Sequence, residues 1–353
     1  MTDALKSFGA ELDSDAAIRL LEHVFKTNLE NEEASAVKDP NGSVKRPTPI
    51  CIWGSHGIGK TAMIKDLANK HGWKFRYCAP AQFEEMGDLH GLPVRLDPNP
   101  DIQGDESTVY MPPDWVPKED DEGPGILLLD DLNRADDRIL RGLMQLVQEF
   151  EMFSWTLPRK WQIVCTANPE GGDYSVTPMD PAMLTRMLHL TMIFDVKSWA
   201  RWAMNAGVDP RGIAFVLTYP EVITGERTTP RTLTQFFDQI ANIDDLKSEL
   251  ELVNVLARSA LDDITATTFL AFVNDGVTQL IEPSNILDAK DFKPIAKRIS
   301  DLSKGEGGAK RVDRLSTICT RLYLHLSAAG YKSETHHAEN LVAFLLLEDL
   351  PND

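Results

Sequence analysis

The stretch GSHGIGKT, from Gly54 to Thr61, directly follows the short apolar run PICIW at residues 49–53. Three glycines within eight residues allow several backbone N–H groups to point at one site, in conformations that side chains would block. A helix beginning at Lys60 would direct its positive dipole end toward the same point. The spacing GxxxxGK[ST] between a strand and a helix therefore predicts a loop that binds nucleotide phosphates.

Each residue of such a loop has an expected role. The ammonium of Lys60 reaches the β- and γ-phosphates, and the hydroxyl of Thr61 is a ligand of Mg²⁺. The residues expected to bind nucleotide are Gly54, Ser55, His56, Gly57, Ile58, Gly59, Lys60, Thr61 and Ala62. The competing interpretation is a glycine-rich bend without a ligand. A metal-binding carboxylate at the end of another buried strand favours the nucleotide site.

The segment GPGILLLDDLNRA provides such a carboxylate, because four apolar residues at 126–129 lead directly into Asp130 and Asp131. Asp130 is expected to hold the Mg²⁺ shell at the end of a central strand. Asp131 is expected to orient and polarise the water that attacks the γ-phosphate. The alternative is that the two acids only cap the next helix.

The order of apolar runs indicates the fold class and the domains. Short apolar runs alternate with helical patterns from Pro49 onward, which is typical of an α/β protein with a parallel sheet. Helical patterns dominate after about Ser198, and Trp199 and Trp202 are expected in the core there. The predicted parts are an N-terminal helix and linker at 1–47, an α/β core at 48–200 and a helical part at 201–353.

The N-terminal part is expected to begin with a helix capped by Ser14, followed by a polar linker at 31–48. Near the other end, His336 and His337 are adjacent in sequence and are not expected to share a helix face. Metal binding by this pair is therefore given little weight.

Composition restricts the partners and the location. The 353 residues carry a formal net charge of −18, which repels nucleic acids and anionic lipid surfaces. The sequence lacks an apolar run of about 20 residues and a signal-peptide pattern at its start, so a cytoplasmic protein without a membrane span is expected. The four cysteines show no metal-binding spacing and are expected to be reduced.

Taken together, these motifs resemble the AAA+ ATPases and, within them, the MoxR-like group with its insertion after the second strand. GSHGIGKT resembles Walker A, LLLDDLNRA resembles Walker B and IVCTANP resembles the sensor 1 strand. MDPAMLTRM is similar to the arginine-finger segment, and RTTPRTL is similar to the start of the sensor 2 helix. MGDLHGLP with VYMPPDW resembles the insertion, and EFEMFSWTLPRKWQ resembles the hairpin before sensor 1. The resemblance covers about Pro49 to Leu233.

The resemblance implies an AAA+ core with a parallel five-stranded sheet flanked by helices, followed by an all-helical lid and C-terminal helices. It implies ATP hydrolysis with Mg²⁺ in a ring oligomer, expected to be hexameric. Asn168 would hold the attacking water, Arg186 would reach the nucleotide of a neighbouring subunit, and Arg231 would contact nucleotide from the lid. With Lys60 and Asp131, these form the expected catalytic set. The implied partner is a protein client or a protein with a von Willebrand A domain, and nucleic acid is disfavoured.

One departure from the family pattern keeps two alternatives open. The second Walker B acid is usually Glu, and here it is Asp131, which is one methylene shorter. A carboxylate displaced by about 1 Å can lower the rate on the order of a hundredfold. A nucleotide-gated scaffold with very slow hydrolysis is therefore one alternative to a chaperone-like remodeller. A nucleic-acid-associated AAA+ motor is the other.

Overall fold

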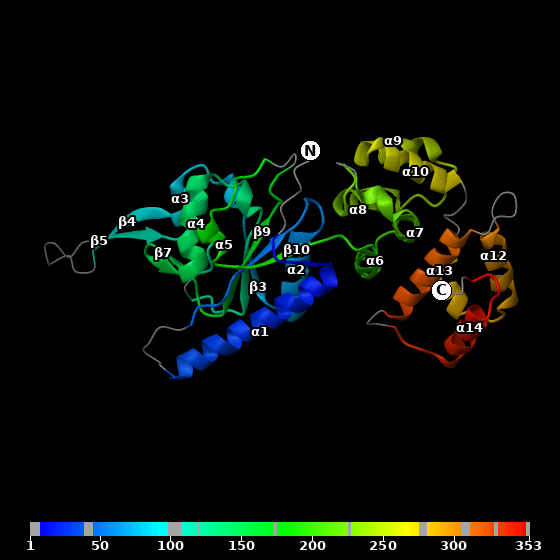
Figure 1. Cartoon of the computed structure of the whole chain (residues 1–353), viewed down its shortest axis with the longest axis horizontal. Helices are drawn as coiled ribbons and strands as arrows, with labels where there is room; N and C mark the ends of the chain where they lie inside the picture. The colour runs from blue at the N-terminus through cyan, green and yellow to red at the C-terminus, as the bar shows by residue number, and fades with distance from the viewer. Residues whose placement is uncertain are drawn as a thin grey trace. The chain divides into compact units, whose positions relative to one another are not determined.

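The computed structural model describes residues 8–38, 45–97, 107–118, 120–171, 175–224, 227–274, 281–304, 311–327 and 331–350. The chain divides into two compact units, residues 1–194 and 195–353. The first unit contains the sheet and the second is built of helices, as the colours of Figure 1 show.

The first unit is built around a six-stranded parallel sheet with the strand order β1-β10-β2-β9-β6-β3. In that order the strands are Ala10–Leu12, Leu188–Met192, Ile50–Trp53, Trp161–Ala167, Gly125–Leu129 and Lys74–Cys78. The predicted fold class, an α/β core with a parallel sheet flanked by helices and followed by further helices, is confirmed. The sheet has six strands instead of five because β1 adds three residues beside β10.

Helices cover both faces of this sheet. Ile52 and Leu128 pack on one side, in the core that α1 (Ser14–Lys38) and α2 (Lys60–His71) share. The neighbouring strand residues Trp53 and Leu129 pack on the other side, where α4 (Asp137–Glu149) lies. Successive residues of a strand point to opposite faces. Continuous apolar strands are therefore the expected sequence for a sheet buried on both sides.

Smaller elements complete the first unit. The segments that resemble the MoxR-like insertion form α3 and an antiparallel hairpin of β4 and β5. The segment before sensor 1 forms the short hairpin of β7 and β8. These elements and α5 have the bounds Met86–His90, Leu92–Leu96, Ser107–Met111, Glu151–Met152, Trp155–Thr156 and Pro181–Leu184.

Two predictions about the N-terminal part are wrong. The side chain of Asp13, not Ser14, accepts the hydrogen bond from the N–H of Ala16 at 2.8 Å, so the cap lies one residue earlier. Helix α1 also continues to Lys38, so residues 31–38 of the predicted linker are helical. This stretch is rich in Glu and Ala and contains no proline or glycine, and such a composition favours continuation of the helix.

The second unit consists of helices α6 to α14. Their bounds are Val196–Asn205, Pro210–Thr218, Pro230–Ile240, Leu250–Ala260, Asp263–Asn274, Pro283–Leu287, Lys293–Ser303, Val312–Leu326 and Thr335–Leu345. Three phenylalanines form an aromatic centre. The ring centroid of Phe269 lies 5.0 Å from that of Phe215 and 4.8 Å from that of Phe236. Trp199 is buried as expected, whereas Trp202 is 39% exposed and is not a core residue.

Across the described part of the chain, no helix has both the length and the apolar character that crossing a membrane requires.

Candidate active site

The loop after β2 has the backbone geometry that phosphate binding requires. Gly57 and Gly59 have φ angles of 73° and 103°, which glycine adopts without steric strain. Gly59 precedes α2 and places no side chain over the start of the helix. An anion in the loop can therefore reach the first N–H groups of α2, at the positive end of the helix dipole.

Lys60 is buried at the centre of this loop and is only 6% exposed. Its ammonium Nζ donates hydrogen bonds to the carbonyl oxygens of Gly54 at 2.6 Å and Ser55 at 3.2 Å. A third acceptor is Oδ1 of Asn168, at 3.4 Å. A buried cation needs acceptors, and phosphate oxygens would be stronger acceptors than these neutral groups because they carry charge.

The carboxylate of Asp130 accepts hydrogen bonds from three hydroxyl groups. Thr61 Oγ1 donates to its two oxygens, at 2.8 and 3.0 Å, and Thr166 Oγ1 donates at 2.6 Å. The hydroxyl of Tyr77 donates to Oδ2 at 3.2 Å. Burial of the ring, together with the charge of Asp130, raises the pKa of Tyr77 to about 12. Tyr77 is therefore a neutral donor at physiological pH.

Asp131 is held in a turn immediately after β6. Its φ and ψ angles are 50° and 45°, a left-handed conformation that Asp tolerates better than most residues. Oδ1 accepts a hydrogen bond from Nδ2 of Asn168 at 2.9 Å, and Oδ2 lies 3.4 Å from Nε of Arg134. The N–H of Asp131 donates to Thr166 Oγ1 at 2.7 Å. Both carboxylate oxygens therefore have partners that fix their direction.

The side chain of Asn168 connects Lys60 with Asp131, because it accepts from Lys60 and donates to Asp131. Its own backbone is clamped by the buried Asn133, which donates to the carbonyl of Asn168 at 2.7 Å and accepts from its N–H at 3.0 Å. This clamp fixes where the amide of Asn168 points.

The strand order explains why residues so far apart in sequence meet. Strand β9 lies between β2 and β6, and all three run parallel. The phosphate loop follows β2, Asn168 follows β9, and Asp130 with Asp131 follows β6. Carboxyl ends of parallel strands meet at one edge of a sheet, where ligands of open α/β folds usually bind.

The structure brings together the predicted residues Lys60, Thr61, Asp130, Asp131 and Asn168. Arg186, which was also predicted, is not part of this group. Arg186 follows α5, and its guanidinium donates to Gln148 Oε1 at 2.6 Å and to the carbonyl of Ala182. Arg231 is exposed near the start of α8 in the second unit. Their expected contacts with nucleotide stay predictions.

Sequence reasoning missed Thr166, Tyr77 and Asn133. Thr166 and Asn133 are completely buried polar residues. A threonine after the apolar run at residues 163–165 was a signal for Thr166, because a buried hydroxyl needs a partner. Tyr77 carried no comparable signal, since its role depends on the pairing of β3 with β6.

No known family model matches this sequence. Among solved structures, the chain is similar to the Thermotoga maritima RuvB Holliday junction branch migration motor, with a TM-score of 0.37, 14% identity and coverage of 80% of this chain and 75% of that chain. A mutant of the same RuvB gives a TM-score of 0.38 and 14% identity, covering 94% of this chain and 98% of that chain. A provisionally assigned ATPase from Cytophaga hutchinsonii gives a TM-score of 0.31 and 13% identity, covering 96% and 88%. At such low TM-scores the similarity carries no weight for function, and the proposals below rest on the geometry of the site.

Proposed function

We propose that this chain is an AAA+ ATPase of the MoxR-like type, which binds and hydrolyses ATP with Mg²⁺. The observation that supports this most strongly is the meeting of Lys60, Thr61 and Asp130 at one sheet edge, beside the Asn168–Asp131 pair. A glycine-rich bend without a ligand would not require a buried ammonium 3.4 Å from an amide that also orients a carboxylate.

The donor atoms around Asp130 fit Mg²⁺. Thr61 Oγ1 and Thr166 Oγ1 each lie 2.6–3.0 Å from a carboxylate oxygen of Asp130, and all of these atoms are possible oxygen ligands. Mg²⁺ prefers oxygen ligands and keeps several water molecules. Thr61 and Asp130 would hold the ion, with Asp130 acting through water. The ion would supply positive charge that offsets the negative charge of the triphosphate.

The residues of the chain then have separate tasks in hydrolysis. Lys60 and the first N–H groups of α2 bind the β- and γ-phosphates and stabilise negative charge there. Asn168 and Asp131 orient a water molecule toward the γ-phosphorus. The water oxygen forms a bond to phosphorus, the bond to the β–γ bridging oxygen breaks, and Asp131 accepts the proton that the water loses. The products are ADP and phosphate.

We further propose that the active form is a cytoplasmic ring, expected to be hexameric, in which Arg186 acts on the nucleotide of the neighbouring subunit. Its position outside the network of its own Lys60 is compatible with a role in trans. Arg231 would contact nucleotide from the helical lid, so that hydrolysis moves the lid and remodels a protein partner. A protein client or a partner with a von Willebrand A domain would fit this activity.

A nucleotide-gated scaffold that scarcely hydrolyses ATP is the second candidate. The contacts of Asp131 favour it, because its short carboxylate is already engaged by Asn168 and Arg134. Such a carboxylate is less available to activate water. A nucleic-acid-associated motor is disfavoured by the net charge of −18.

The rate of phosphate release from ATP in the presence of Mg²⁺ separates these candidates. The wild type, Lys60→Ala and Asp131→Glu proteins are compared with and without duplex DNA. Release by the wild type well above that of Lys60→Ala, and unchanged by DNA, supports the proposed ATPase. Equal rates for these two proteins favour the scaffold. Strong stimulation by DNA at moderate salt favours the motor and contradicts the proposal.

A further inference from the structure

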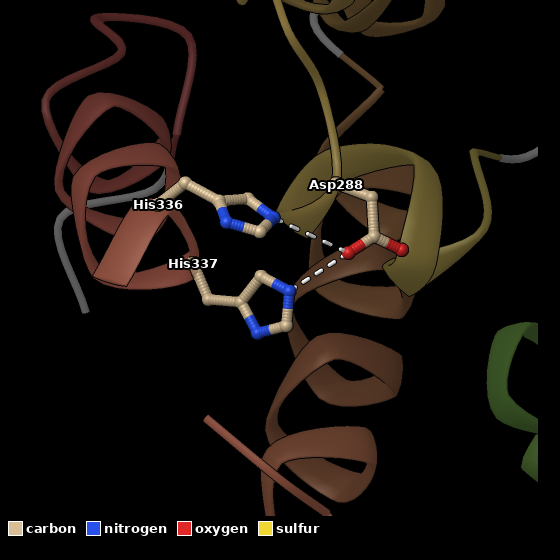
Figure 2. A group of neighbouring side chains, drawn as sticks. All are labelled: Asp288, His336 and His337. Carbon is tan, nitrogen blue, oxygen red and sulfur yellow. Dashed lines mark hydrogen bonds and ion pairs between the residues drawn. The ribbon is translucent and has the colours of Figure 1, made fainter. Parts of the chain in front are cut away.

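A group of three side chains in the second unit converges on one point (Figure 2). Asp288 follows α11, and His336 and His337 lie in the first turn of α14. The Nε2 atom of His337 lies 2.7 Å from Oδ1 of Asp288, and Nε2 of His336 lies 3.7 Å from the same oxygen. Among the residues that the structure describes, this is the one set of at least three His, Cys, Asp or Glu side chains with ligand atoms all within 4.8 Å.

The two histidines do meet, although they are adjacent in sequence. Consecutive helix positions point about 100° apart, which is why metal binding by this pair had little support from sequence alone. Their ring centroids nevertheless lie 4.4 Å apart. Asp288 approaches from another element, and both imidazoles turn toward it (Figure 2).

The other nitrogen of each ring is also engaged. Nδ1 of His337 lies 2.9 Å from the hydroxyl of Tyr331, and Nδ1 of His336 lies 3.4 Å from Oε2 of Glu334. Histidines that bind metals commonly hold their second nitrogen in such contacts, which orient the ring and increase its basicity. Both Nε2 atoms are therefore directed at the same region.

A separate contact fixes the segment that carries Asp288. The side-chain amide of Asn340, in α14, donates to the carbonyl of Leu287 at 2.6 Å and to that of Ala289 at 2.9 Å. These two carbonyls flank Asp288, and Asn340 is 9% exposed. These two hydrogen bonds hold helix α14 beside α11 without using the three converging side chains. The packing of the two helices therefore does not depend on a bound ion.

The donor set identifies the class of ion. Two imidazoles and one carboxylate suit Zn²⁺ and related divalent transition metals, whereas Mg²⁺ and Ca²⁺ prefer oxygen alone. Bonds of about 2.0–2.1 Å in a tetrahedral site place ligand atoms roughly 3.3 Å apart. The two observed separations from Asp288 Oδ1, 2.7 and 3.7 Å, lie on either side of that value. Small movements of exposed side chains would equalise them.

We propose that Asp288, His336 and His337 bind a divalent transition-metal ion of the Zn²⁺ class, which clamps α14 to the end of α11. The ion takes the place of the hydrogen that Nε2 of His337 and Asp288 now share. The neutral ring then carries its hydrogen on Nδ1 and donates it to Tyr331, at the expense of the longer 3.3 Å bond from the N–H of Glu334. Asp288 and His336 are 60% and 46% exposed, so water completes the coordination.

The test is Zn²⁺ binding to the full chain by calorimetry with a competing chelator, and by metal analysis after gel filtration. Millimolar Mg²⁺ is present throughout to occupy the oxygen site at Asp130. The wild type is expected to retain one Zn²⁺ per chain. His336→Ala and Asp288→Asn are expected to bind Zn²⁺ at least about tenfold more weakly, because each loses one of three ligands.

The variants are chosen to keep the fold, so that a change in Zn²⁺ affinity reports the loss of a ligand. The ion pairs of His336 are long and exposed, at 3.4 and 3.7 Å, whereas His337 helps cap α14 and is avoided. The matched control is His71→Ala, which removes a histidine that pairs with a single carboxylate, Glu22, at 2.9 Å. This control is expected to retain one Zn²⁺.

Hydrogen exchange provides a second readout. Zn²⁺ is expected to slow amide exchange in α14 in the wild type and in His71→Ala, but not in His336→Ala. A wild type that retains no Zn²⁺ would overturn the proposal. So would equal Zn²⁺ affinity in the wild type, His336→Ala and Asp288→Asn. Neither result depends on nucleotide hydrolysis, so the test is independent of the proposed function.

Discussion

Replacing Lys60 with methionine is expected to weaken ATP binding strongly while leaving the fold intact. The methionine side chain has similar length and fills the same buried position, but it has no charge and donates no hydrogen bond. In the ligand-free chain, Lys60 donates hydrogen bonds to neutral acceptors, the nearest being the carbonyl of Gly54 at 2.6 Å. Removing the ammonium also removes its desolvation cost, which offsets part of the cost of leaving these carbonyl oxygens without their donor.

The loss in the nucleotide complex is larger, because there the ammonium would face phosphate. A hydrogen bond to a charged group contributes about 1.5–3 kcal/mol, so the dissociation constant for Mg·ATP is expected to rise about tenfold to a hundredfold. At an ATP concentration of about 100 times the wild-type dissociation constant, ATP stabilises the wild type by about 2.7 kcal/mol. A variant with hundredfold weaker binding gains only about 0.4 kcal/mol under the same conditions.

Two measurements check this expectation. Calorimetric titration gives the dissociation constants, and thermal unfolding with and without Mg·ATP gives the stabilisation. Lys65→Met is the matched control, because Lys65 is an exposed lysine of the same helix; it should bind ATP as the wild type does. If Lys60→Met binds Mg·ATP within about twofold of the wild type while remaining folded, the assignment of the phosphate loop is refuted.

Three further predictions concern the same site. Asn168→Ala should lower phosphate release about tenfold to a hundredfold with nearly unchanged ATP affinity, because Asp131 loses a 2.9 Å hydrogen bond that orients it; a normal rate would exclude this role. Mixing Arg186→Ala with Asp131→Asn subunits should restore part of the turnover that each lacks alone, and no recovery in mixed rings that demonstrably form would contradict a site shared between subunits. The pKa of Tyr77 is raised in the folded chain from 10.0 to about 12, so its contribution to stability is present below pH 10 and is lost as the pH rises toward 12. Tyr77→Phe should therefore lose less stability than the wild type between pH 10 and 12 in denaturant titrations, and identical losses would show that the pKa of Tyr77 is not raised in the folded chain.

The positions of the glycine-rich loop before α2 and of the two acids after β6 were predictable because their signals are local. A glycine-rich turn between an apolar strand and a helix specifies its own geometry, and Lys60 and Thr61 occupy the positions that it dictates. The same holds for Asp130, which follows a strand that is apolar throughout. Strands buried on both faces read as continuous apolar runs, so the class of the sheet was also predictable.

The remaining features depend on contacts between distant segments. The bond from Tyr77 to Asp130 requires β3 to pair with β6, and the clamp of Asn133 on Asn168 requires β6 to pair with β9. No local pattern contains that information. Strand β1 is three residues long and was missed because so short a segment has little periodicity to recognise. The meeting of His336 with Asp288 joins residues 48 positions apart, and helical spacing argued against a shared site for the adjacent His336 and His337.

A crystal structure of the chain with Mg²⁺ and a non-hydrolysable ATP analogue tests the central claim most directly. The account predicts triphosphate density in the loop at 54–61, with a γ-phosphate oxygen within hydrogen-bonding distance of Lys60 Nζ. It also predicts Mg²⁺ between the Thr61 hydroxyl and the Asp130 carboxylate. Crystals that show no nucleotide in this loop at millimolar analogue and Mg²⁺, or nucleotide bound only elsewhere, would contradict it.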